Sequence, residues 1–412
     1  MFSNSRNSTN FVVLLTMTFS HHSGPFQTKK MTKNHLEYFK VKNFRRFDEL
    51  ELDGLGQFNL ITGDNNVGKT SLLEALLVDE DWKQTLWNYH RTLNIRGLAI
   101  NIKSIVDPRN DTQEIVFPEA NYLTFLINTW KALYIHFKVR KLDKLSGNWI
   151  LDDKKQGFAS HRRREVSILK VEPMQVNAKH FLRVFRGQDN QQIPDDYDTW
   201  LHVEELALGT TNSQPKGFPF LPVFRGHAED VVGLFSEVAR DSQQIEVEIT
   251  NNMKSVVPEI QAIRILQLEG TDHLFLHIKG QDQPLPLTQF GDGAIRLFVI
   301  LLHLIKNKGD RLMIDEVDTG IHHSRMKDFL KNLVKMAVVN DVQLFMTTHS
   351  LECQQAFAEV FEDPEMVHLQ KEFRNIALVE AQDHSVKPFV YNFQQLSENL
   401  ELGIETRGRK LA

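Results

Sequence analysis

A short glycine-bounded segment constrains this chain more than any other feature of its sequence. Residues 61–77 read ITGDNNVGKTSLLEALL and contain the spacing G-x-x-x-x-G-K-[ST]. The matching positions are Gly63, Gly68, Lys69 and Thr70. Glycines let a backbone curl around phosphate oxygens, and the helix that follows adds its positive N-terminal end. The apolar QFNLI before the loop predicts a buried strand and SLLEALL after it a helix, so the segment predicts a phosphate-binding loop.

Within this loop the residue types predict individual tasks. Lys69 carries the cation that reaches the β- and γ-phosphates, and the hydroxyl of Thr70 is a ligand for Mg²⁺. The residues expected to surround the nucleotide are Gly63, Asp64, Asn65, Asn66, Val67, Gly68, Lys69, Thr70 and Ser71. The alternative interpretation is a glycine-rich turn that binds no nucleotide.

Two later strands are predicted to end in polar side chains. One apolar strand ends in Asp315, which can hold Mg²⁺ through water, and Glu316, which can polarise an attacking water. The other ends in His349, which can reach the γ-phosphate and sense the nucleotide. The alternatives are a strand that merely ends in surface acids and a helix cap at Ser350, and the cap is compatible with the sensor role.

A turn before the first of these strands separates classes of nucleotide-binding proteins. Gly291, Asp292 and Gly293 open a predicted helix at 293–307 that is apolar nearly all round and therefore buried. Kinases and GTPases lack such an element. The turn resembles the signature segment of ABC-type ATPases, which grips the γ-phosphate bound to the other subunit. The alternative is an ordinary glycine turn before a helix.

The order of elements predicts an α/β fold. Alternation of strands and helices after residue 223 predicts a parallel sheet covered on both faces. Predicted strands include 38–44, 50–52, 164–176, 311–316 and 342–350, and a hairpin is predicted around 269–272. The helical segments are predicted at 228–257, 293–307 and 324–339. Residues 122–139 fit either a strand or a helix.

Residues 36–412 resemble the AAA-type ATPase-core proteins related to the OLD family, which have an ABC-type (SMC/RecF-like) head. The resemblance rests on NFRRFDEL, ITGDNNVGKTSLLEAL, LTQFGDGAIRLF, LMIDEVDTGIHHS, QLFMTTHS and the tail YNFQQLSENLELGIETRGR. It implies a P-loop fold with a mainly parallel central sheet flanked by helices, an antiparallel β subdomain and an inserted region. The LSGGQ form is absent, with Thr288 and Phe290 near the usual serine, and Asp318 replaces a frequent glutamate.

The same resemblance implies a function. It implies that ATP and Mg²⁺ are bound, that ATP is hydrolysed with Glu316 and His349 as the catalytic residues, and that Thr70 and Asp315 hold the metal. It also implies an ATP-dependent homodimer in which Gly291–Gly293 meets the partner's nucleotide, with DNA or a separately encoded nuclease or effector as further partners. The alternative is an ATP-gated scaffold with negligible turnover that recruits an effector. Too few residues follow His349 for a Toprim nuclease domain, so Glu380 and Asp383 are interpreted as a strand and a turn.

Composition narrows the partners. The chain has 412 residues and a net charge of −5, so its surface as a whole does not indicate nucleic-acid binding. Residues 138–170 nevertheless carry ten Lys or Arg against four Asp or Glu, which fits either a DNA contact or a solvated hairpin face. A single cysteine, Cys353, excludes an intramolecular disulfide and suits the cytoplasm. The apolar run at 11–19 is too short to span a membrane, so no membrane partner is expected.

These patterns predict five regions. Residues 1–34 are expected to be a disordered extension or a start placed too early, with a signal peptide as a weaker alternative. Residues 35–80 and 226–365 are expected to build the ATPase head. Residues 81–225 are expected to be an inserted α/β region, and residues 366–412 a strand–helix tail.

Overall fold

The computed structural model describes residues 35–79, 82–95, 103–107, 112–116, 133–140, 164–176, 179–188, 199–202, 218–223, 230–239 and 242–407. The predicted extension at 1–34 lies outside these residues, as do 141–163 of the basic segment and most of the loop predicted at 202–222. Among the described residues, no helix is both long enough and apolar enough to cross a membrane.

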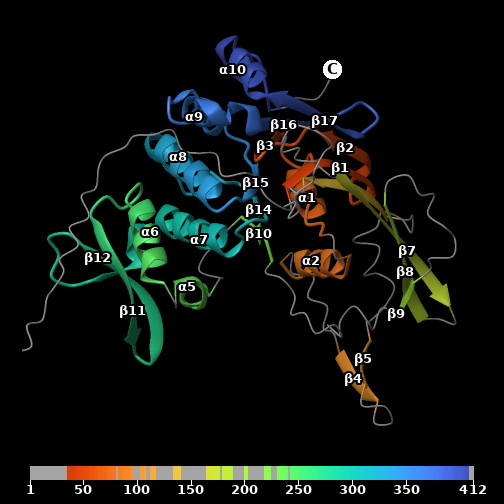
Figure 1. Cartoon of the computed structure of the whole chain (residues 1–412), viewed down its shortest axis with the longest axis horizontal. Coiled ribbons are helices and arrows are strands. Elements are labelled where there is room, and N and C mark those ends of the chain that lie inside the picture. Colours follow the sequence, from red (N-terminus) through yellow and green to blue (C-terminus); the bar gives the residue numbers. More distant parts are fainter. Residues whose placement is uncertain are drawn as a thin grey trace, which may run out of the picture. The chain divides into compact units, whose positions relative to one another are not determined.

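A six-stranded sheet forms the centre of the fold (Figure 1). Its order is β10 (Phe220–Leu221), β14 (Arg311–Ile314), β15 (Gln343–Thr347), β3 (Phe58–Gly63), β16 (Phe373–Glu380) and β17 (Val386–Asn392). The first five strands are parallel to one another, and β17 pairs with β16 in the antiparallel direction. The predicted mainly parallel sheet is confirmed.

The strands at the middle of this sheet are buried on both faces, and their side chains alternate between two cores. Leu312, Ile314 and Leu344 join one core, whereas Met313 and Phe345 join the other. A parallel sheet needs such double cover because its crossover helices lie on its faces. The alternation therefore divides the protein into two apolar layers with the sheet between them.

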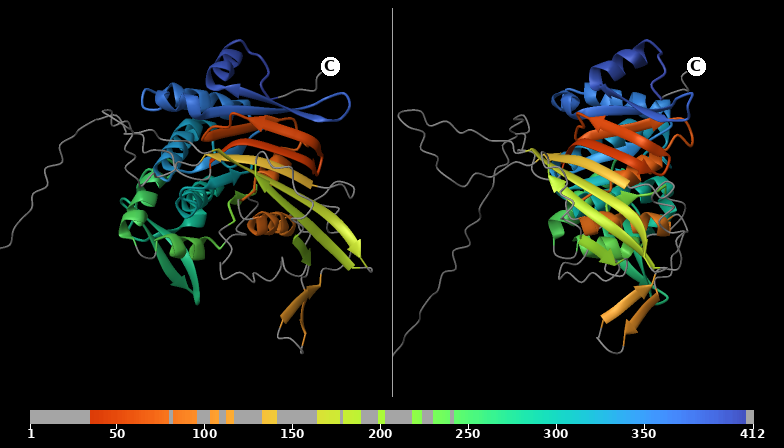
Figure 2. Two further views of the ribbon diagram at one scale, coloured as in Figure 1. Left: turned by 45° about the vertical axis from the view of Figure 1, so that its right-hand side comes forward. Right: turned by 90° about the vertical axis from the view of Figure 1, so that its right-hand side faces the viewer.

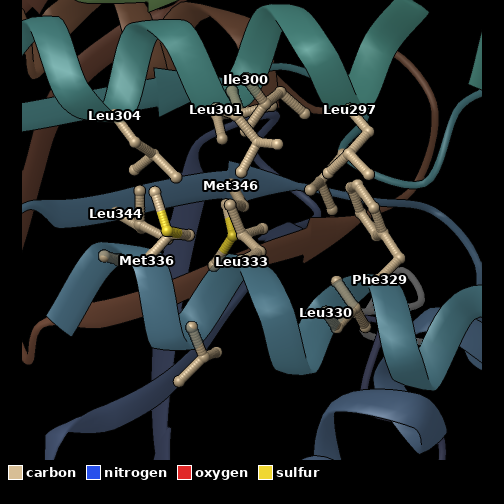
Figure 3. Packing of buried hydrophobic residues seen from close by; sticks show 14 of the residues in the cluster. Leu297, Ile300, Leu301, Leu304, Phe329, Leu330, Leu333, Met336, Leu344 and Met346 are labelled. Atoms are coloured by element: carbon tan, nitrogen blue, oxygen red, sulfur yellow. The ribbon is translucent and has the colours of Figure 1, made fainter. Parts of the chain in front are cut away.

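Long helices cover one face. These are α7 (Asp292–Lys306), α8 (His323–Val339) and α9 (Leu351–Glu362), with α5 (Val231–Ala239) and α6 (Gln243–Met253) packed on α7. Figure 3 shows Leu297, Ile300 and Leu301 of α7 pointing toward Phe329 and Leu333 of α8, with Leu344 and Met346 of β15 between the two helices in this view. The helices predicted at 293–307 and 324–339 are confirmed.

The segment predicted to be helical at 228–257 contains two helices. Ser242 has an extended backbone and its hydroxyl accepts a hydrogen bond from the N–H of Ile245, so it begins α6 as an N-cap. α5 and α6 are therefore separate helices, and they contact one another. Periodicity extends across such a break because both helices bury the same kind of apolar face.

The other face is covered by α1 (Lys69–Ala75), α2 (Trp82–Ile95) and an antiparallel sheet (Figure 2). The order of that sheet is β2 (Phe47–Asp53), β1 (His35–Phe44), β6 (Leu133–Arg140), β7 (Arg164–Val176), β8 (Lys179–Gln188) and β9 (Thr199–His202). The ambiguous segment at 122–139 therefore ends in a strand, and the strand favoured at 164–176 is present. A separate hairpin joins β4 (Lys103–Asp107) to β5 (Thr112–Val116).

The predicted hairpin around residues 269–272 is present as β11 (Ile260–Leu268) and β12 (Thr271–Ile278), with β13 (Leu285–Pro286) beside β12. Glu269 and Gly270 form its two-residue turn with φ of 49° and 81°. Two positive φ values in succession match the twist of antiparallel strands. The remaining elements are the short 3₁₀ segments η2 (Leu287–Phe290) and η3 (Val367–Glu372) and the helix α10 (Phe393–Glu401).

The core between α7, β15 and α8 makes a stability prediction. Leu333 on α8 is fully buried, so Leu333→Ala is expected to lower the free energy of unfolding by roughly 2–5 kcal/mol. Asp328→Ala on the exposed side of the same helix is the control and should change it by less than about 0.5 kcal/mol. Urea unfolding curves of the three proteins measure both effects, and equal losses in the two variants would contradict the assignment of this core.

Candidate functional site

The phosphate-binding loop connects β3 to α1 and depends on backbone conformations that side chains disfavour. Gly63 and Gly68 have φ of 152° and 108°, and Asn66 has φ of 65°. A Cβ on Gly63 would lie 2.7 Å from Val67 Cγ1 and 2.8 Å from the carbonyl oxygen of Leu378. No side chain fits there, so glycine at 63 is needed both for its conformation and for its lack of volume.

Lys69 lies within the loop to which it belongs. Its ammonium donates hydrogen bonds to the carbonyl oxygens of Gly63, at 2.8 Å, and Asp64, at 3.0 Å. Burial lowers the pKa of Lys69, while the charges of Glu316 and Asp315 act in the opposite direction. A cation that costs free energy to bury and is bonded only to neutral carbonyls is well placed to exchange them for phosphate oxygens.

Asp315 is the centre of a hydrogen-bonded cluster at the end of β14. Thr70 Oγ1 donates to it from α1 at 3.0 Å, and Thr347 Oγ1 donates to it from β15 at 2.6 Å. The N–H of Glu316 donates to the same Thr347 hydroxyl at 2.7 Å. The structure thus brings together residues from the ends of two neighbouring strands and from the start of α1.

This cluster fits a magnesium ion. Mg²⁺ prefers oxygen ligands in an octahedron at about 2.1 Å, so two adjacent ligands lie roughly 3 Å apart. The Thr70 hydroxyl and the Asp315 carboxylate are 3.0 Å apart and are the hydroxyl and acid expected of such a site. Among the residues that the structure describes, no group of three or more His, Cys, Asp or Glu could bind a metal ion by itself. Oxygens from phosphate or water would have to complete the coordination.

Glu316 and His349 face one another beside this cluster. Glu316 has a positive φ of 47°, a rare conformation for a residue with a side chain. Its carboxylate accepts a hydrogen bond from Thr319 Oγ1 at 3.3 Å and lies 3.9 Å from His349 Nδ1. Both side chains remain partly exposed, so this acid and base pair is accessible to water and to a ligand.

A pocket of about 230 Å³ opens beside the first half of the loop. Its lining residues are Gly63, Asp64, Asn65, His349, Glu405 and Arg407. The sequence pattern identified the first four as candidates. It gave no role to the last two, although both lie in the tail segment that carries the family resemblance.

The predicted signature turn does not line this pocket. Gly291 has φ of 81° and caps α7, and Asp292 is exposed at the first turn of that helix. A Cβ on Gly293 would lie 2.4 Å from the carbonyl oxygen of Gly320. The turn therefore packs directly against the loop that follows Glu316.

A second link joins α7 to the acidic cluster, and the sequence patterns did not identify it. Arg296 is almost fully buried, and its guanidinium donates to the carbonyl oxygen of Asp315 at 2.6 Å and to that of Pro222 at 2.9 Å. Arginine inside an apolar helix was the available signal, because a buried guanidinium requires acceptors. Arg296 holds the backbone of Asp315 to the helix that begins at the signature turn.

Other polar side chains have structural roles. His322 caps α8, with its Nδ1 accepting a hydrogen bond from the N–H of Ser324, and stacks near His323. Ser350 caps α9, as expected. Glu380 ends β16, and Asp383 lies in the following turn, where it accepts a hydrogen bond from the N–H of Ser385. These positions match the strand and turn expected for the latter pair.

Two family models match the chain. The one described as "AAA domain, putative AbiEii toxin, Type IV TA system" matches residues 137–352, and the one described as "AAA ATPase domain" matches residues 35–205. Together they include the phosphate loop, the signature turn and both strand ends of the site.

Several known proteins are similar over most of their length. A Helicobacter pylori protein called "ATP/GTP phosphatase" is 27% identical over 393 residues, which cover 90% of this chain and 98% of that protein. The "DNA replication and repair protein RecF" of Lysinibacillus sphaericus is 22% identical over 385 residues, covering 82% of this chain and 98% of that protein. A solved SmcHead, bound to the C-winged helix domain of ScpA, covers 88% of this chain and 99% of its own at 11% identity and a TM-score of 0.48.

The buried carboxylate makes a pH prediction. Burial raises the pKa of Asp315, and the hydrogen bonds from Thr347 and Thr70 offset only part of this shift. The ionised form is thus disfavoured in the folded protein. Its cost to the free energy of unfolding is absent below about pH 4, grows as the pH rises toward the raised pKa, and is complete above it. Without nucleotide or metal, Asp315→Asn should melt at a higher temperature than the wild type at pH 7, with the gap closing toward pH 4. A gap that widens toward acid pH would contradict the shift.

Proposed function

The chain belongs to the AAA domain family whose model matches residues 137–352, and from this premise we propose how it uses ATP. It is an ATPase with an ABC-type head of the SMC/RecF kind. Two copies of the chain face one another and enclose two ATP molecules. Closing and opening of this dimer drives or regulates a DNA-directed or defence partner.

One observation carries the catalytic part of this proposal. Thr70, Asp315, Thr347 and the backbone of Glu316 form an unbroken hydrogen-bonded chain beside Lys69. In the proposed site the loop residues 63–71 hold the phosphates, with Lys69 on the β- and γ-phosphates. Thr70 and Asp315 hold Mg²⁺, which neutralises phosphate charge when bound.

Glu316 is the proposed general base for water. Thr347 fixes its backbone N–H, and Thr319 contacts its carboxylate, so the side chain has a defined position beside His349, which lines the pocket. His349, 3.9 Å from that carboxylate, is the proposed sensor of the γ-phosphate. It can donate a hydrogen bond to a phosphate oxygen and keep the water-activating acid in place.

Dimerisation is proposed because Gly291–Gly293 does not line the pocket of its own chain. Asp292 is exposed, and the first N–H groups of α7 need an acceptor from outside the helix. A phosphate on a second copy supplies one. Gly293 contacts Gly320 in the loop after Glu316, so the turn and the acids of one chain respond to closure together.

The proposed regions and partners have more limited support. Residues 35–80 and 226–365 are proposed to build the head, with 81–225 inserted and 366–412 as the tail, and β3 lies between β15 and β16 in one sheet despite their separation in sequence. The edge strand β10, which pairs with β14, comes from within 81–225. Similarity to the RecF protein favours a DNA-directed partner. The single cysteine is buried and free, which fits the proposed cytoplasmic location.

Substitutions in the loop and at the acid test the chemistry. Lys69→Ala should abolish ATP binding because it removes the main cation for the phosphates. Glu316→Gln should retain binding and lose hydrolysis by about 10²- to 10⁴-fold, the usual contribution of a general base. Glu359→Gln, at an exposed position of α9, is the matched control. Nucleotide binding and steady-state phosphate release, with and without duplex DNA, measure these effects.

The outcomes separate two functions. Wild-type turnover by Glu316→Gln would reject Glu316 as the base. Tight ATP binding by the wild type without turnover, with or without DNA, would favour the ATP-gated scaffold over the proposed ATP-hydrolysing dimer.

Light scattering tests dimerisation. Glu316→Gln with Mg-ATP should accumulate as a dimer, and adding Asp292→Arg should block closure while each chain still binds ATP. Asp292 is the better probe than Gly293, since any side chain at 293 collides with Gly320 in the same chain. Asp272→Arg on the exposed hairpin is the control of equal charge change. A molar mass that ignores nucleotide, or equal effects of the two arginines, would refute the closed dimer.

A further inference from the structure

The pocket beside the phosphate loop contains a cation that none of the proposed steps uses. Arg407 lines it together with Gly63, Asp64, Asn65 and His349. Arg407 lies 344 residues after Gly63 in the sequence, and no nucleotide-binding pattern includes it. Its place in the pocket must therefore come from the way the tail is anchored.

Thr406 supplies that anchor. It is 1% exposed, its carbonyl oxygen accepts a hydrogen bond from Thr62 Oγ1 at 3.1 Å, and its hydroxyl donates to Gln354 Oε1 at 2.6 Å. Thr62 directly precedes Gly63 in β3, and Gln354 belongs to the first turn of α9. The backbone of Arg407 is thus fixed one residue from a buried link to the strand that carries the phosphate loop.

The guanidinium is oriented by the other tail residue of the pocket. Arg407 Nε donates to Glu405 Oε1 at 2.8 Å, and its Nη2 donates to Glu405 Oε2 at 2.7 Å. Among the described residues, the terminal nitrogen Nη1 has no protein acceptor within hydrogen-bond distance. A planar fork that is held on one side by a carboxylate offers its remaining N–H groups in a fixed direction.

The pocket lies at the end of the site where the last phosphate is expected. The carbonyl oxygens of Gly63 and Asp64 that bind the Lys69 ammonium belong to residues that line it. His349 lines it and lies 3.9 Å from the Glu316 carboxylate. Lys69, Glu316 and His349 are the three side chains proposed to act at the γ-phosphate, so Arg407 shares their side of the loop.

We infer that Arg407 contacts the terminal phosphate of bound ATP and that Glu405 is its positioning residue. This inference rests on the proposed function. The contact adds a second fixed cation to Lys69 at the group that distinguishes ATP from ADP. Charge-assisted hydrogen bonds between arginine and phosphate are among the strongest in proteins, so the tail makes the pocket selective for the triphosphate.

Equilibrium binding of a non-hydrolysable ATP analogue and of ADP, each with Mg²⁺, tests the inference. In the full-length wild type the analogue should bind more tightly than ADP. Arg407→Ala should weaken analogue binding by roughly tenfold to a hundredfold and leave ADP binding within about twofold. Arg407→Lys should recover part of the loss because it keeps the charge without the fork.

Two further proteins complete the experiment. Arg264→Ala removes an arginine that also pairs with a glutamate, Glu246, but lies on the β11–β12 hairpin outside the pocket. It should change neither affinity. Arg407→Gln, compared by thermal unfolding, provides a second variant if alanine lowers the melting temperature.

The results have distinct meanings. Equal weakening of analogue and ADP by Arg407→Ala would place Arg407 on a part common to both nucleotides and overturn the assignment, as would unchanged binding of both. A wild type that binds neither nucleotide would overturn the proposed function itself. A wild type that prefers the analogue, with a variant that keeps this preference, would overturn only the role of Arg407.

Discussion

Burial of the central strands on both faces is the constraint on which the rest of the structure depends. β3, β14 and β15 have no exposed residues, and their apolar side chains belong to one of the two cores. Polar groups with a chemical task can then appear only where the strands end. Because the strands are parallel, their carboxyl ends share one edge. Asp315, Glu316 and His349 therefore meet the phosphate loop without any long-range pairing having to be specified separately.

At that edge, hydrogen bonds join Asp315 to three elements that lie apart in the sequence, α1, β15 and α7. Its carboxylate is held by hydroxyls from α1 and β15, and its carbonyl oxygen is held by Arg296 of α7. Removing a buried carboxylate from water costs free energy, which these donors offset in part. Because of these three attachments, a displacement of α7 would reach Asp315 directly. A contact at Gly291–Gly293 would therefore act, through Arg296 alone, on the carboxylate that is proposed to hold Mg²⁺.

Much of the fold, together with the phosphate loop and the acids of the site, could be predicted from the sequence because each depends on residues that are close together in the chain. The loop spacing at 63–70, the apolar strands and the acids at 315 and 316 are contiguous signals, and the sheet that they predict is present. The break at Ser242 was missed because a capping hydroxyl resembles any other serine in a helical pattern. Arg296 was missed because its acceptor, the carbonyl oxygen of Asp315, is brought near it only by packing. Arg407 was missed because its place in the pocket depends on the path of the tail, which no pattern encodes. The basic segment at 141–163 lies outside the described residues, so a contact with DNA there stays a prediction.

The hydrogen bonds of Thr406 also bear on the order in which parts of the chain fold. Its hydrogen bond to Thr62 joins residues 344 apart in sequence, and closing so long a loop costs entropy before any contact repays it. The tail can bind only after β3, β16 and α9 have assembled, since all three contribute partners for Thr406 or its neighbours. Glu405 and Arg407 are thus expected to reach the pocket late in folding. If Arg407 contacts the terminal phosphate as proposed, nucleotide binding at full affinity would report that the whole head has reached its native arrangement, and partly folded chains would bind ATP more weakly.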